Sequence, residues 1–473
     1  MKKLPFVSII IVNYNGARLL GNCLSSLFKN KYPKNKFEVI VVDNNSRDDS
    51  RTFVKRNFPI VKLIKLSENK GFAAGNNEGY KHAVGELILL LNSDTIADQN
   101  WIHEMVAAAS DQKVGIVASK ILLNVPFVEV SISSTIAQQS DFDESIDFSP
   151  RGVLLENISS SNTLAQERIW YKSGFSEPTI LKDITTRWST GEAKILLPLV
   201  DEVNDFSFII HGYPTHNNQL ISSGSISIKN EPVVKFSISP NSIFRKNFTI
   251  HRTASKHRHI WLVQNAGNIV LKDGYSKDIG SVTRIINKQV DEFYEQDSAF
   301  FCRKRNLVAA CGAGMLIKRA VINDISFFNE HYFMYYEDID LSLRAWRQGW
   351  DIIFAPKAII KHDHRATTGR AESAFLISMI EKNHLFLLLT NFPIRIFLKH
   401  YILFLFRLFD SILRQFAFRF KRWDLFLIWR LRASGRLSAF FSFHSQLLIF
   451  INIRYWWSTR DKRTYNQLEQ HLY

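Results

Sequence analysis

The chain has 473 residues, 46% hydrophobic and 22% charged, a composition typical of folded protein that excludes extensive disorder. This length exceeds that of one ordinary domain and predicts two or three modules. Lys and Arg outnumber Asp and Glu by 60 to 44, which suits anionic partners such as sugar nucleotides, lipid headgroups or nucleic acid. The three cysteines, Cys23, Cys302 and Cys311, lack paired spacing. They argue against a disulfide framework or a cysteine metal site and favour a reducing compartment.

The first part of the chain, residues 1–125, alternates strand-like and helix-like segments in the βαβ manner that predicts a parallel sheet. Open sheets of this kind bind ligands at the carboxyl ends of their strands. Strands are expected at 7–12, 39–42, 61–66 and 87–91, and helices at 17–28 and 75–84.

Residues 126–265 form short alternating runs separated by Gly, Pro, Asn and Asp, which indicates an inserted antiparallel sandwich or barrel. The serine tract 159–161 has the composition of a linker. Trp170, Tyr171 and Trp188 can stack on sugar rings, but core and edge packing is the favoured interpretation.

The first pattern resumes in residues 266–372, with a helix predicted at 338–348. Residues 373–473 are rich in Phe, Leu, Ile, Trp and Arg at helical spacing. No uncharged apolar stretch reaches the ~20 residues that a spanning helix needs, and the opening apolar run is too short for a good signal peptide. We therefore expect a soluble or monotopic protein.

Two strand ends carry aspartates. Asp43, followed by Asn44, can accept a hydrogen bond from a nucleobase; the alternative is helix capping by Asp48 or Ser46 and a simple turn. The strand LILLLNSD places Asp94 directly after Asn92 and Ser93. A carboxylate there can bind a divalent ion that bridges a pyrophosphate. This looks like a DXD-type motif with Asn92 in place of its first aspartate; a helix N-cap is the alternative.

The segment ENKGFAAGNNEG places Gly71 and Gly75 around Phe72 and puts Asn76 at an expected helix start. Backbone amides there can approach a phosphate or sugar. A tight strand-to-helix turn is the alternative.

Further carboxylates and histidines follow later in the chain. In FMYYEDIDLSLRAWRQGW an expected aromatic strand delivers Glu337 and Asp338, which can deprotonate an acceptor hydroxyl or merely favour a helix N-terminus electrostatically. His362, Asp363 and His364 follow an apolar strand. A neutral imidazole there can complete the coordination of a metal held by Asp94, or the histidines are ordinary polar surface.

Seven segments in order resemble the inverting glycosyltransferases of family 2, particularly rhamnosyltransferase-like enzymes of O-antigen and cell-wall polysaccharide assembly. The segments are SIIIVNYNG, VIVVDNNSRDDS, ENKGFAAGNN, LLLNSDT, CGAGMLIKR, FFNEHYFMYYEDIDLSLRAWRQGW and KHDH. The resemblance covers about 6–123 and 265–390. It implies the α/β GT-A fold, a mostly parallel mixed sheet flanked by helices, here with an inserted antiparallel β-sandwich and a C-terminal amphipathic helical region.

On this resemblance, residues 1–125 are the nucleotide-sugar-binding half and 266–372 the acceptor-side half of the catalytic domain. Residues 126–265 are the inserted module and 373–473 a membrane-associating region. Asp94 and His362 would bind Mg²⁺ or Mn²⁺, and Asp338 would be the general base, supported by Glu337. The implied donor-site residues are Asn13, Asn15, Asp43, Asn44, Gly71, Phe72, Gly75, Asn76, Asn92, Asp94, Gly312, Ala313 and Gly314.

The implied partners are a nucleotide-diphospho-sugar, with dTDP-rhamnose first and UDP- or GDP-sugars next, and a glycan or lipid-linked glycan acceptor. The QxxRW signature of processive synthases is absent, so one sugar or a few are expected per acceptor. Asn92 leaves open an inactive, glycan-binding relative. Nucleic-acid binding is not expected, because no helix-turn-helix, zinc-finger spacing or RNP-like sheet occurs. Oligomeric state is not predicted.

The C-terminal helices are expected to lie in a membrane interface, with Arg395, Lys399, Arg407, Arg414 and Arg422 on anionic headgroups. This predicts a peripheral protein on the cytoplasmic face of the inner membrane. The alternative is that these helices pack on the catalytic domain or on a second subunit.

Overall fold

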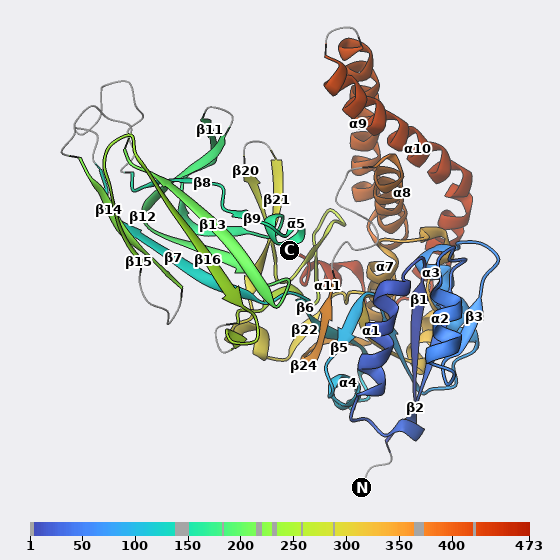
Figure 1. Cartoon of the computed structure of the whole chain (residues 1–473). Helices are drawn as coiled ribbons and strands as arrows, with labels where there is room; N and C mark the ends of the chain where they lie inside the picture. The colour runs from blue at the N-terminus through green and yellow to red at the C-terminus, as the bar shows by residue number, and fades with distance from the viewer. Residues whose placement is uncertain are drawn as a thin grey trace. The chain divides into compact units, whose positions relative to one another are not determined.

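The computed structural model describes residues 4–137, 151–181, 184–213, 220–228, 234–256, 259–286, 289–363, 373–419 and 422–473. His364 lies outside them. The chain forms two compact units (Figure 1). The first comprises Met1–Asn124, Gln264–Ile279 and Ser298–Tyr473, and the second Val125–Val263 and Gly280–Asp297.

Four parallel strands form one half of the sheet of the first unit, in the order β4-β1-β2-β3. Helix α3 lies closely on β1 because it presents glycines: a Cβ on Gly75 would lie 2.8 Å from Val12 Cγ1, and one on Gly79 2.5 Å from Ile10 Cγ2. The elements of this half are β1 (Val7–Asn13), α1 (Ala17–Phe28), β2 (Phe37–Asp43), α2 (Ser50–Asn57), β3 (Lys62–Lys65), α3 (Gly71–Lys81) and β4 (Leu87–Leu91).

Beyond β4 the sheet becomes mixed, because β23 runs antiparallel to both β4 and β6, and β24 runs parallel to β6. Gly314 at the start of β23 pairs with Leu91 at the end of β4, so the start of β23 shares the edge at which β1, β2 and β4 end. The elements here are β5 (Thr95–Ala97), α4 (Trp101–Ala108), β6 (Val114–Leu123), β18 (Asn268–Val270), β19 (Ser276–Asp278), β22 (Arg305–Leu307), β23 (Gly314–Lys318), α6 (Arg319–Ile325), α7 (Glu337–Arg347) and β24 (Asp351–His362).

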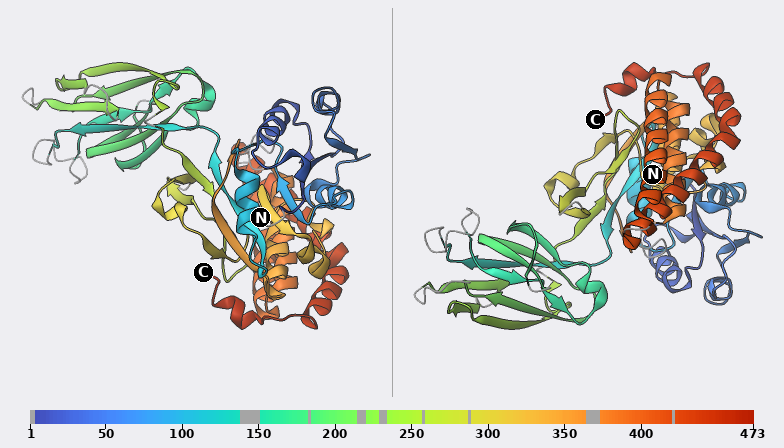
Figure 2. Two further views of the ribbon diagram at one scale, coloured as in Figure 1. Left: turned by 90° about the horizontal axis from the view of Figure 1, so that it is seen from below. Right: turned by 90° about the horizontal axis from the view of Figure 1, so that it is seen from above.

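The second unit is a β-sandwich whose layers, β15-β14-β7-β12 and β12-β8-β13-β16, share the long strand β12 (Figure 2). Side chains from both layers, among them Val130, Phe206 and Phe208, fill one apolar core. The elements are β7 (Phe127–Ser134), β8 (Leu154–Glu156), β9 (Ser159–Ser160), α5 (Thr163–Gln166), β10 (Trp170–Phe175), β11 (Thr179–Leu181), β12 (Ile184–Pro198), β13 (Val203–His211), β14 (Ser222–Ile228), β15 (Val234–Ile238), β16 (Ile243–His251), β20 (Ser281–Ile286) and β21 (Gln289–Gln296). Strand β17 (Leu262–Asn265) spans the junction of the units.

The prediction of a linker at the serine tract is wrong for Ser159 and Ser160. These residues form strand β9, which pairs with Phe206 and Ser207 of β13. Backbone pairing with an established strand outweighs the weak local preference of serine.

Each of the three candidate sugar-stacking rings packs within the sandwich unit. Trp170 stacks on Phe293 at 5.2 Å, and Trp188 stacks on Tyr213 at 6.3 Å. The Tyr171 hydroxyl accepts a hydrogen bond from the Ile158 amide. These contacts favour the packing interpretation of the aromatic residues.

The C-terminal region is helical, with α8 (Ala374–Asn391), α9 (Ile394–Phe418), α10 (Trp423–Ser458) and α11 (Tyr465–Glu469). Helix α8 is buried along most of its length, and its Phe386 ring stacks on Phe450 of α10 at 3.6 Å. Helices α9 and α10 carry many exposed apolar side chains. Among the described helices none combines the length and apolarity needed to cross a membrane.

Candidate active site

Asn13 and Asp43 end the neighbouring strands β1 and β2 in register, and both side chains are buried. Asp43 Oδ1 accepts hydrogen bonds from the Ser46 amide (3.1 Å) and from Arg51 Nε (2.5 Å). Asn13 Nδ2 donates to Ser46 Oγ. The Asn13 side-chain oxygen, Oδ1, and the other Asp43 oxygen, Oδ2, are buried and receive no hydrogen bond from the described residues. A buried acceptor without a hydrogen bond lowers the stability of the fold, so a ligand N–H or O–H bound to these two oxygens would be stabilising. The turn at Ser46 accounts for only one of the two Asp43 oxygens.

Asn15 and Asn44 shape the loops around this pair. Asn15 has φ 52°, and its Oδ1 accepts from the Arg47 amide at 2.7 Å. Asn44 Nδ2 donates to Asn69 Oδ1 and to the Gly71 carbonyl, while its Oδ1 accepts from the Lys70 amide. The Asn44 side chain therefore braces the end of β2 against the start of α3.

The start of α3 differs from expectation, because the helix begins at Gly71 rather than Gly75. Its first amides, of Phe72 and Ala73, donate to the Phe333 carbonyl at 2.7 and 3.1 Å, so they are not presented to a phosphate. The prediction that Asn76 lies at a helix start is also wrong: Asn76 lies in the second turn, where its Nδ2 donates to the Phe72 carbonyl. Local glycine spacing did not reveal the distant carbonyl that caps this helix.

Asp94 lies beside His362, with Asp94 Oδ1 3.0 Å from His362 Nε2 and both side chains buried. Strands β5 and β24 produce this contact by pairing Thr95 with His362. Asp94 does not cap a helix, because β5 follows it and α4 begins only at Trp101. The contact between Asp94 and His362 is therefore compatible with a shared metal ion, and a helix-capping role for Asp94 is excluded.

The tautomer of His362 bears on metal binding. His362 Nδ1 lies 2.9 Å from Gln264 Oε1, which can only accept, so Nδ1 carries the proton. In the neutral ring Nε2 then directs a lone pair at Asp94, an arrangement that a bound cation would stabilise. A 3.0 Å separation also matches two adjacent ligands about 2.1 Å from an octahedral ion.

Two protein ligands are nonetheless a small set. Among the described residues no group of three or more His, Cys, Asp and Glu is placed to hold a metal. The residues present fit an ion whose remaining positions are filled by pyrophosphate oxygens and water, as is common for Mg²⁺.

The glycine segment before β23 forms a close-packed wall. The Ala313 carbonyl accepts from the Asn92 amide at 3.1 Å. A Cβ on Gly314 would lie 2.4 Å from Ile360 Cδ1, and one on Gly312 3.2 Å from the Phe72 ring. These contacts join the end of β4, the wall and α3.

Glu337 and Asp338 begin α7. The Gly312 amide donates to Asp338 Oδ2 at 2.9 Å, and the Ile339 amide to its Oδ1 at 2.8 Å. Burial raises the pKa of Asp338 despite these two donors. Burial and then the neighbouring Asp338 charge raise the pKa of Glu337 well above its usual value, and Glu337 Oε2 is buried without a hydrogen-bond partner in the described residues. Asp340 pairs with Arg344 inside the protein and has a structural place.

The expected site residues therefore come together along one edge of the sheet. A Cβ on Gly16 would lie 2.4 Å from Asn13 Oδ1 and 3.5 Å from Ser93 Oγ, so the ends of β1 and β4 adjoin. The wall connects Asn92 to Asp338 through Ala313 and Gly312. Gly75 packs against Val12 of β1, and the Asn76 side chain donates to the Phe72 carbonyl within α3.

Sequence reasoning missed three residues that act on this group: Arg51, Gln264 and Phe333. Arg51 follows Asp43 by eight positions and carried no distinguishing pattern. Gln264 lies 98 positions from His362, inside the range assigned to the inserted module. Phe333 was placed in an expected strand, although its φ is 63°.

Two family models match the chain. The model described as glycosyl transferase family 2 matches residues 8–151, and the model described as glycosyl transferase family group 2 matches residues 269–459. The chain belongs to glycosyltransferase family 2. Its mixed sheet, with the strand-end residues on one edge, is the GT-A fold of this family 2 glycosyltransferase.

Curated relatives match short stretches of the chain. It is 31% identical over 126 residues to glycosyltransferase AglE of Haloferax volcanii, covering 26% of this chain and 41% of the relative. It is 36% identical over 122 residues to the O-antigen biosynthesis protein RfbC of Myxococcus xanthus, covering 25% and 9%. It is 33% identical over 76 residues to an N-acetylglucosaminyl-diphospho-decaprenol L-rhamnosyltransferase of Mycobacterium tuberculosis, covering 16% and 25%. The matches thus span less than half of each of these relatives.

Solved structures also resemble this family 2 glycosyltransferase. The alignment with GalNAc-T7, solved with UDP, GalNAc and Mn²⁺, covers 82% of this chain and 48% of the GalNAc-T7 chain, with 12% identity and a TM-score of 0.43. The mannosyltransferase PcManGT of Pyrobaculum calidifontis with GDP-Man and Mn²⁺ covers 94% and 88%, with 12% identity and a TM-score of 0.38.

Proposed function

We propose that this protein is an inverting, divalent-metal-dependent transferase that moves a sugar from a nucleotide-diphospho-sugar to a glycan or lipid-linked glycan in surface polysaccharide biosynthesis. One observation carries the proposal: the unsatisfied acceptors of Asn13 and Asp43, the Asp94–His362 pair and the carboxylate of Asp338 lie along one sheet edge. The first group suits a base and ribose, the second a cation, and the third a base for the acceptor hydroxyl.

The proposed roles follow from the surroundings of each side chain. Asn13 Oδ1 and Asp43 Oδ2 accept hydrogen bonds from the nucleoside, which stabilises two buried atoms that have no hydrogen-bond partner among the described residues. The Gly312 and Ile339 amides hold the Asp338 carboxylate in a fixed orientation. Asp338 takes the proton of the attacking hydroxyl, and its raised pKa makes it a stronger base than an exposed aspartate.

Asp94 and His362 would hold Mg²⁺ or Mn²⁺, with Gln264 fixing the imidazole tautomer. A bound divalent ion supplies neutralisation of the charge that develops on the leaving nucleoside diphosphate. No acid is then needed for the leaving group. The hydroxyl that Asp338 deprotonates attacks the anomeric carbon from the face opposite the leaving nucleoside diphosphate, so the bond to the acceptor forms as the bond to the diphosphate breaks and the carbon is inverted.

The finer assignment of substrates is part of the proposal. Relatives named for O-antigen biosynthesis and for L-rhamnosyl transfer to a decaprenol-linked sugar support a surface glycan and dTDP-rhamnose as the first donor to test. UDP- and GDP-sugars follow.

A donor panel tests the proposal. Each nucleotide sugar is incubated with the protein and Mn²⁺, with and without a lipid-linked or free glycan acceptor, and release of nucleoside diphosphate is measured before and after chelation. We expect one donor to be consumed and chelation to stop its consumption. Glycan binding without consumption of any donor would instead identify an inactive relative.

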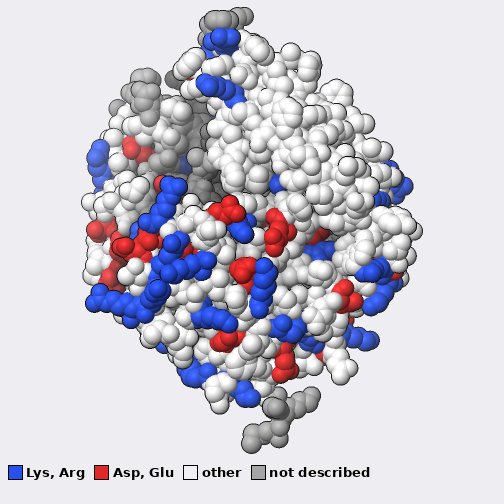
Figure 3. All heavy atoms as spheres, turned by 90° about the vertical axis from the view of Figure 1, so that its right-hand side faces the viewer, with Lys and Arg blue, Asp and Glu red and all other residues white. Residues whose placement is uncertain are grey.

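We further propose that α9 and α10 rest on an anionic membrane surface, where a lipid-linked acceptor would be found. The upper right of the face in Figure 3 is almost free of charged side chains, while Lys and Arg side chains lie at the very top. Exposed apolar residues recur every three or four positions on α9: Ile394, Leu398, Ile402, Phe406, Phe409, Leu413 and Phe416. On α10 the exposed set includes Trp423, Leu427, Leu437, Phe441, Leu448, Ile451 and Tyr455.

The expected headgroup contacts need one revision. Arg395 and Lys399 are exposed, as the membrane proposal requires, and Arg414 and Arg422 are exposed although each pairs with a nearby aspartate. Arg407 instead donates to Glu381 of α8 and to the Tyr275 hydroxyl, so its charge is used within the protein. Burial and the Glu381 carboxylate act on it in opposite senses, and the pKa of Arg407 ends above its usual value.

Vesicle sedimentation tests this surface. Phe406→Glu/Phe409→Glu should lower binding to vesicles containing anionic lipid by ~10-fold or more, because burying each apolar side chain is worth ~1.5–3 kcal/mol. The matched control is Ile60→Glu/Ile180→Glu, two apolar residues elsewhere that are at least as exposed as Phe406 and Phe409. Equal vesicle binding by both double variants would exclude the membrane face. If Phe406→Glu/Phe409→Glu instead converts an oligomer of this chain to a monomer, a second subunit covers this face.

A further inference from the structure

Asn383 in the middle of α8 is fully buried and faces three backbone carbonyls. Its Nδ2 lies 2.9 Å from the Tyr332 oxygen, 2.8 Å from the Met334 oxygen and 2.8 Å from the Tyr335 oxygen. An amide nitrogen has two hydrogens, so these three carbonyls share them. A side chain that serves only to fill space would not need this arrangement.

The segment that receives these bonds, residues 331–336, is strained. Phe333, Tyr335 and Tyr336 have φ values of 63°, 68° and 70°, which cost non-glycine residues ~1–3 kcal/mol each. At Phe333, with ψ −64°, the Met334 amide donates to the Tyr332 carbonyl at 2.8 Å, which makes the rare classic γ-turn. Such a backbone persists only where surrounding contacts hold it.

The strained segment touches both sides of the proposed site. The residues after Tyr336 are Glu337 and Asp338, and the Phe333 carbonyl caps the first amides of α3. A second residue of α8, Lys382, also holds the strained segment by donating to the His331 carbonyl at 2.9 Å. Burial lowers the pKa of Lys382 to about 8.

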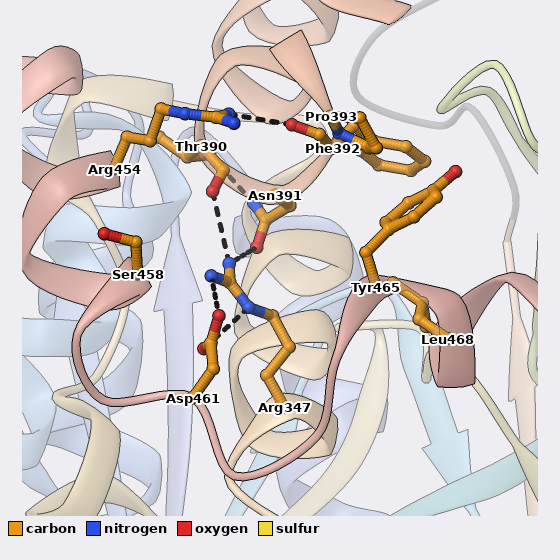
Figure 4. Close-up of a pocket in the computed structure, with 10 residues that line it drawn as sticks. All are labelled: Arg347, Thr390, Asn391, Phe392, Pro393, Arg454, Ser458, Asp461, Tyr465 and Leu468. Atoms are coloured by element: carbon orange, nitrogen blue, oxygen red, sulfur yellow. Dashed lines mark hydrogen bonds and ion pairs between the residues drawn. The ribbon is translucent and has the colours of Figure 1, made fainter.

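Helix α8 is fixed to α7 at its far end as well. Arg347 donates to the Thr390 carbonyl and to Asn391 Oδ1 while it pairs with Asp461 (Figure 4). Asn391 Nδ2 also donates to Asp340 Oδ1 of α7. Because these hydrogen bonds fix the C-terminal end of α8 to α7, Asn383 holds the segment from a helix that is itself anchored to α7.

We propose that Asn383 is a positioning residue for Asp338: by holding the strained segment 331–336 it sets where α7 begins and where the carboxylate lies. The consequence for turnover rests on the proposed function. The claim that Asn383 holds the segment is independent of the proposed function.

The test uses the full chain with Asn383→Asp, which keeps the shape but removes the two donors. The control is Ser378→Ala, also on α8, which removes a partly buried hydrogen bond to Ser438 of α10 without touching the segment. Hydrogen exchange at residues 332–337 should accelerate at least tenfold in Asn383→Asp and stay unchanged in the control. With the donor that the panel identifies, kcat should fall ~100-fold, the scale of a 1 Å misplacement, while the KM for the donor changes far less.

Unchanged exchange in the segment would overturn the proposal. Faster exchange with full turnover would overturn its catalytic part. If the wild type consumes no donor, the proposed function fails, and the exchange result still decides whether Asn383 holds the segment. Should Asn383→Asp not fold, Asn383→Ser, which retains one donor, is measured in its place and should show the same pattern.

Discussion

Two pairs of carboxylates in this protein lie in opposite electrostatic surroundings. At the strand ends, Asp43 contacts Arg51 and Asp94 contacts His362, so each carboxylate has a nitrogen partner. At the start of α7, Glu337 and Asp338 are adjacent to each other, form no ion pair within the described residues, and have raised pKa values because they are buried. The first pair suits holding charged ligands, and the second suits taking up a proton.

The largest expected effect comes from removing the proton acceptor. Asp338→Asn should lower kcat by ~10²–10⁴-fold, the usual contribution of a general base. Steady-state kinetics at saturating donor and Mn²⁺ measure it. The control is Glu330→Gln, an exposed acid in the same region that accepts from Asn77. If both variants had comparable kcat, the carboxylates at the start of α7 would not have the proton-accepting role that distinguishes them from the strand-end pair.

A smaller effect is expected at the partner of the metal-binding histidine. Gln264→Leu should weaken Mn²⁺ binding ~10–100-fold, because Gln264 fixes the His362 tautomer. Titration with Mn²⁺ measures it. Gln348→Leu, which removes a buried glutamine that donates to the Arg460 carbonyl, is the control. An unchanged Mn²⁺ affinity would show that the strand-end pair does not hold the ion.

The pH dependence of kcat sharpens the same comparison. Asp338 must be ionised to act as a base, and burial favours its neutral form, so its pKa lies above that of an ordinary aspartate. Turnover should therefore fall as the pH is lowered, along a limb whose midpoint lies above ~3.9. A limb at or below that value would contradict the proposed environment of Asp338.

The smallest effect is expected at Arg51, whose side chain is one-third exposed. Arg51→Gln should raise the KM for the donor only a few-fold, since partly exposed ion pairs contribute ~0.2–1 kcal/mol. Arg56→Gln on the exposed side of the same helix is the control. A change above ~30-fold would mean that Arg51 contacts the donor directly.

The sequence was sufficient where function follows a local pattern. Asp43 and Asp94 each follow an apolar run that ends at the carboxyl end of a strand, and the expected helix at 338–348 is α7 within one residue. In such places hydrophobic periodicity fixes both the element and its end.

The sequence was insufficient where the partner is distant. The aromatic run before Glu337 has strand propensity, yet Asn383, nearly fifty positions later, holds it in left-handed conformations. The α3 amides suggest a phosphate site until the Phe333 carbonyl is seen to occupy them. Tertiary contacts of this kind override local propensity and leave no local pattern.

The affinity of UDP, GDP and dTDP in the presence of Mn²⁺, measured for Asp94→Asn and Asp338→Asn, tests the division of labour most directly. Asp94→Asn should lose the metal-dependent part of nucleotide binding, whereas Asp338→Asn should bind nucleotide as tightly as the wild type. Equal loss in both variants, or loss in neither, would contradict this division of labour.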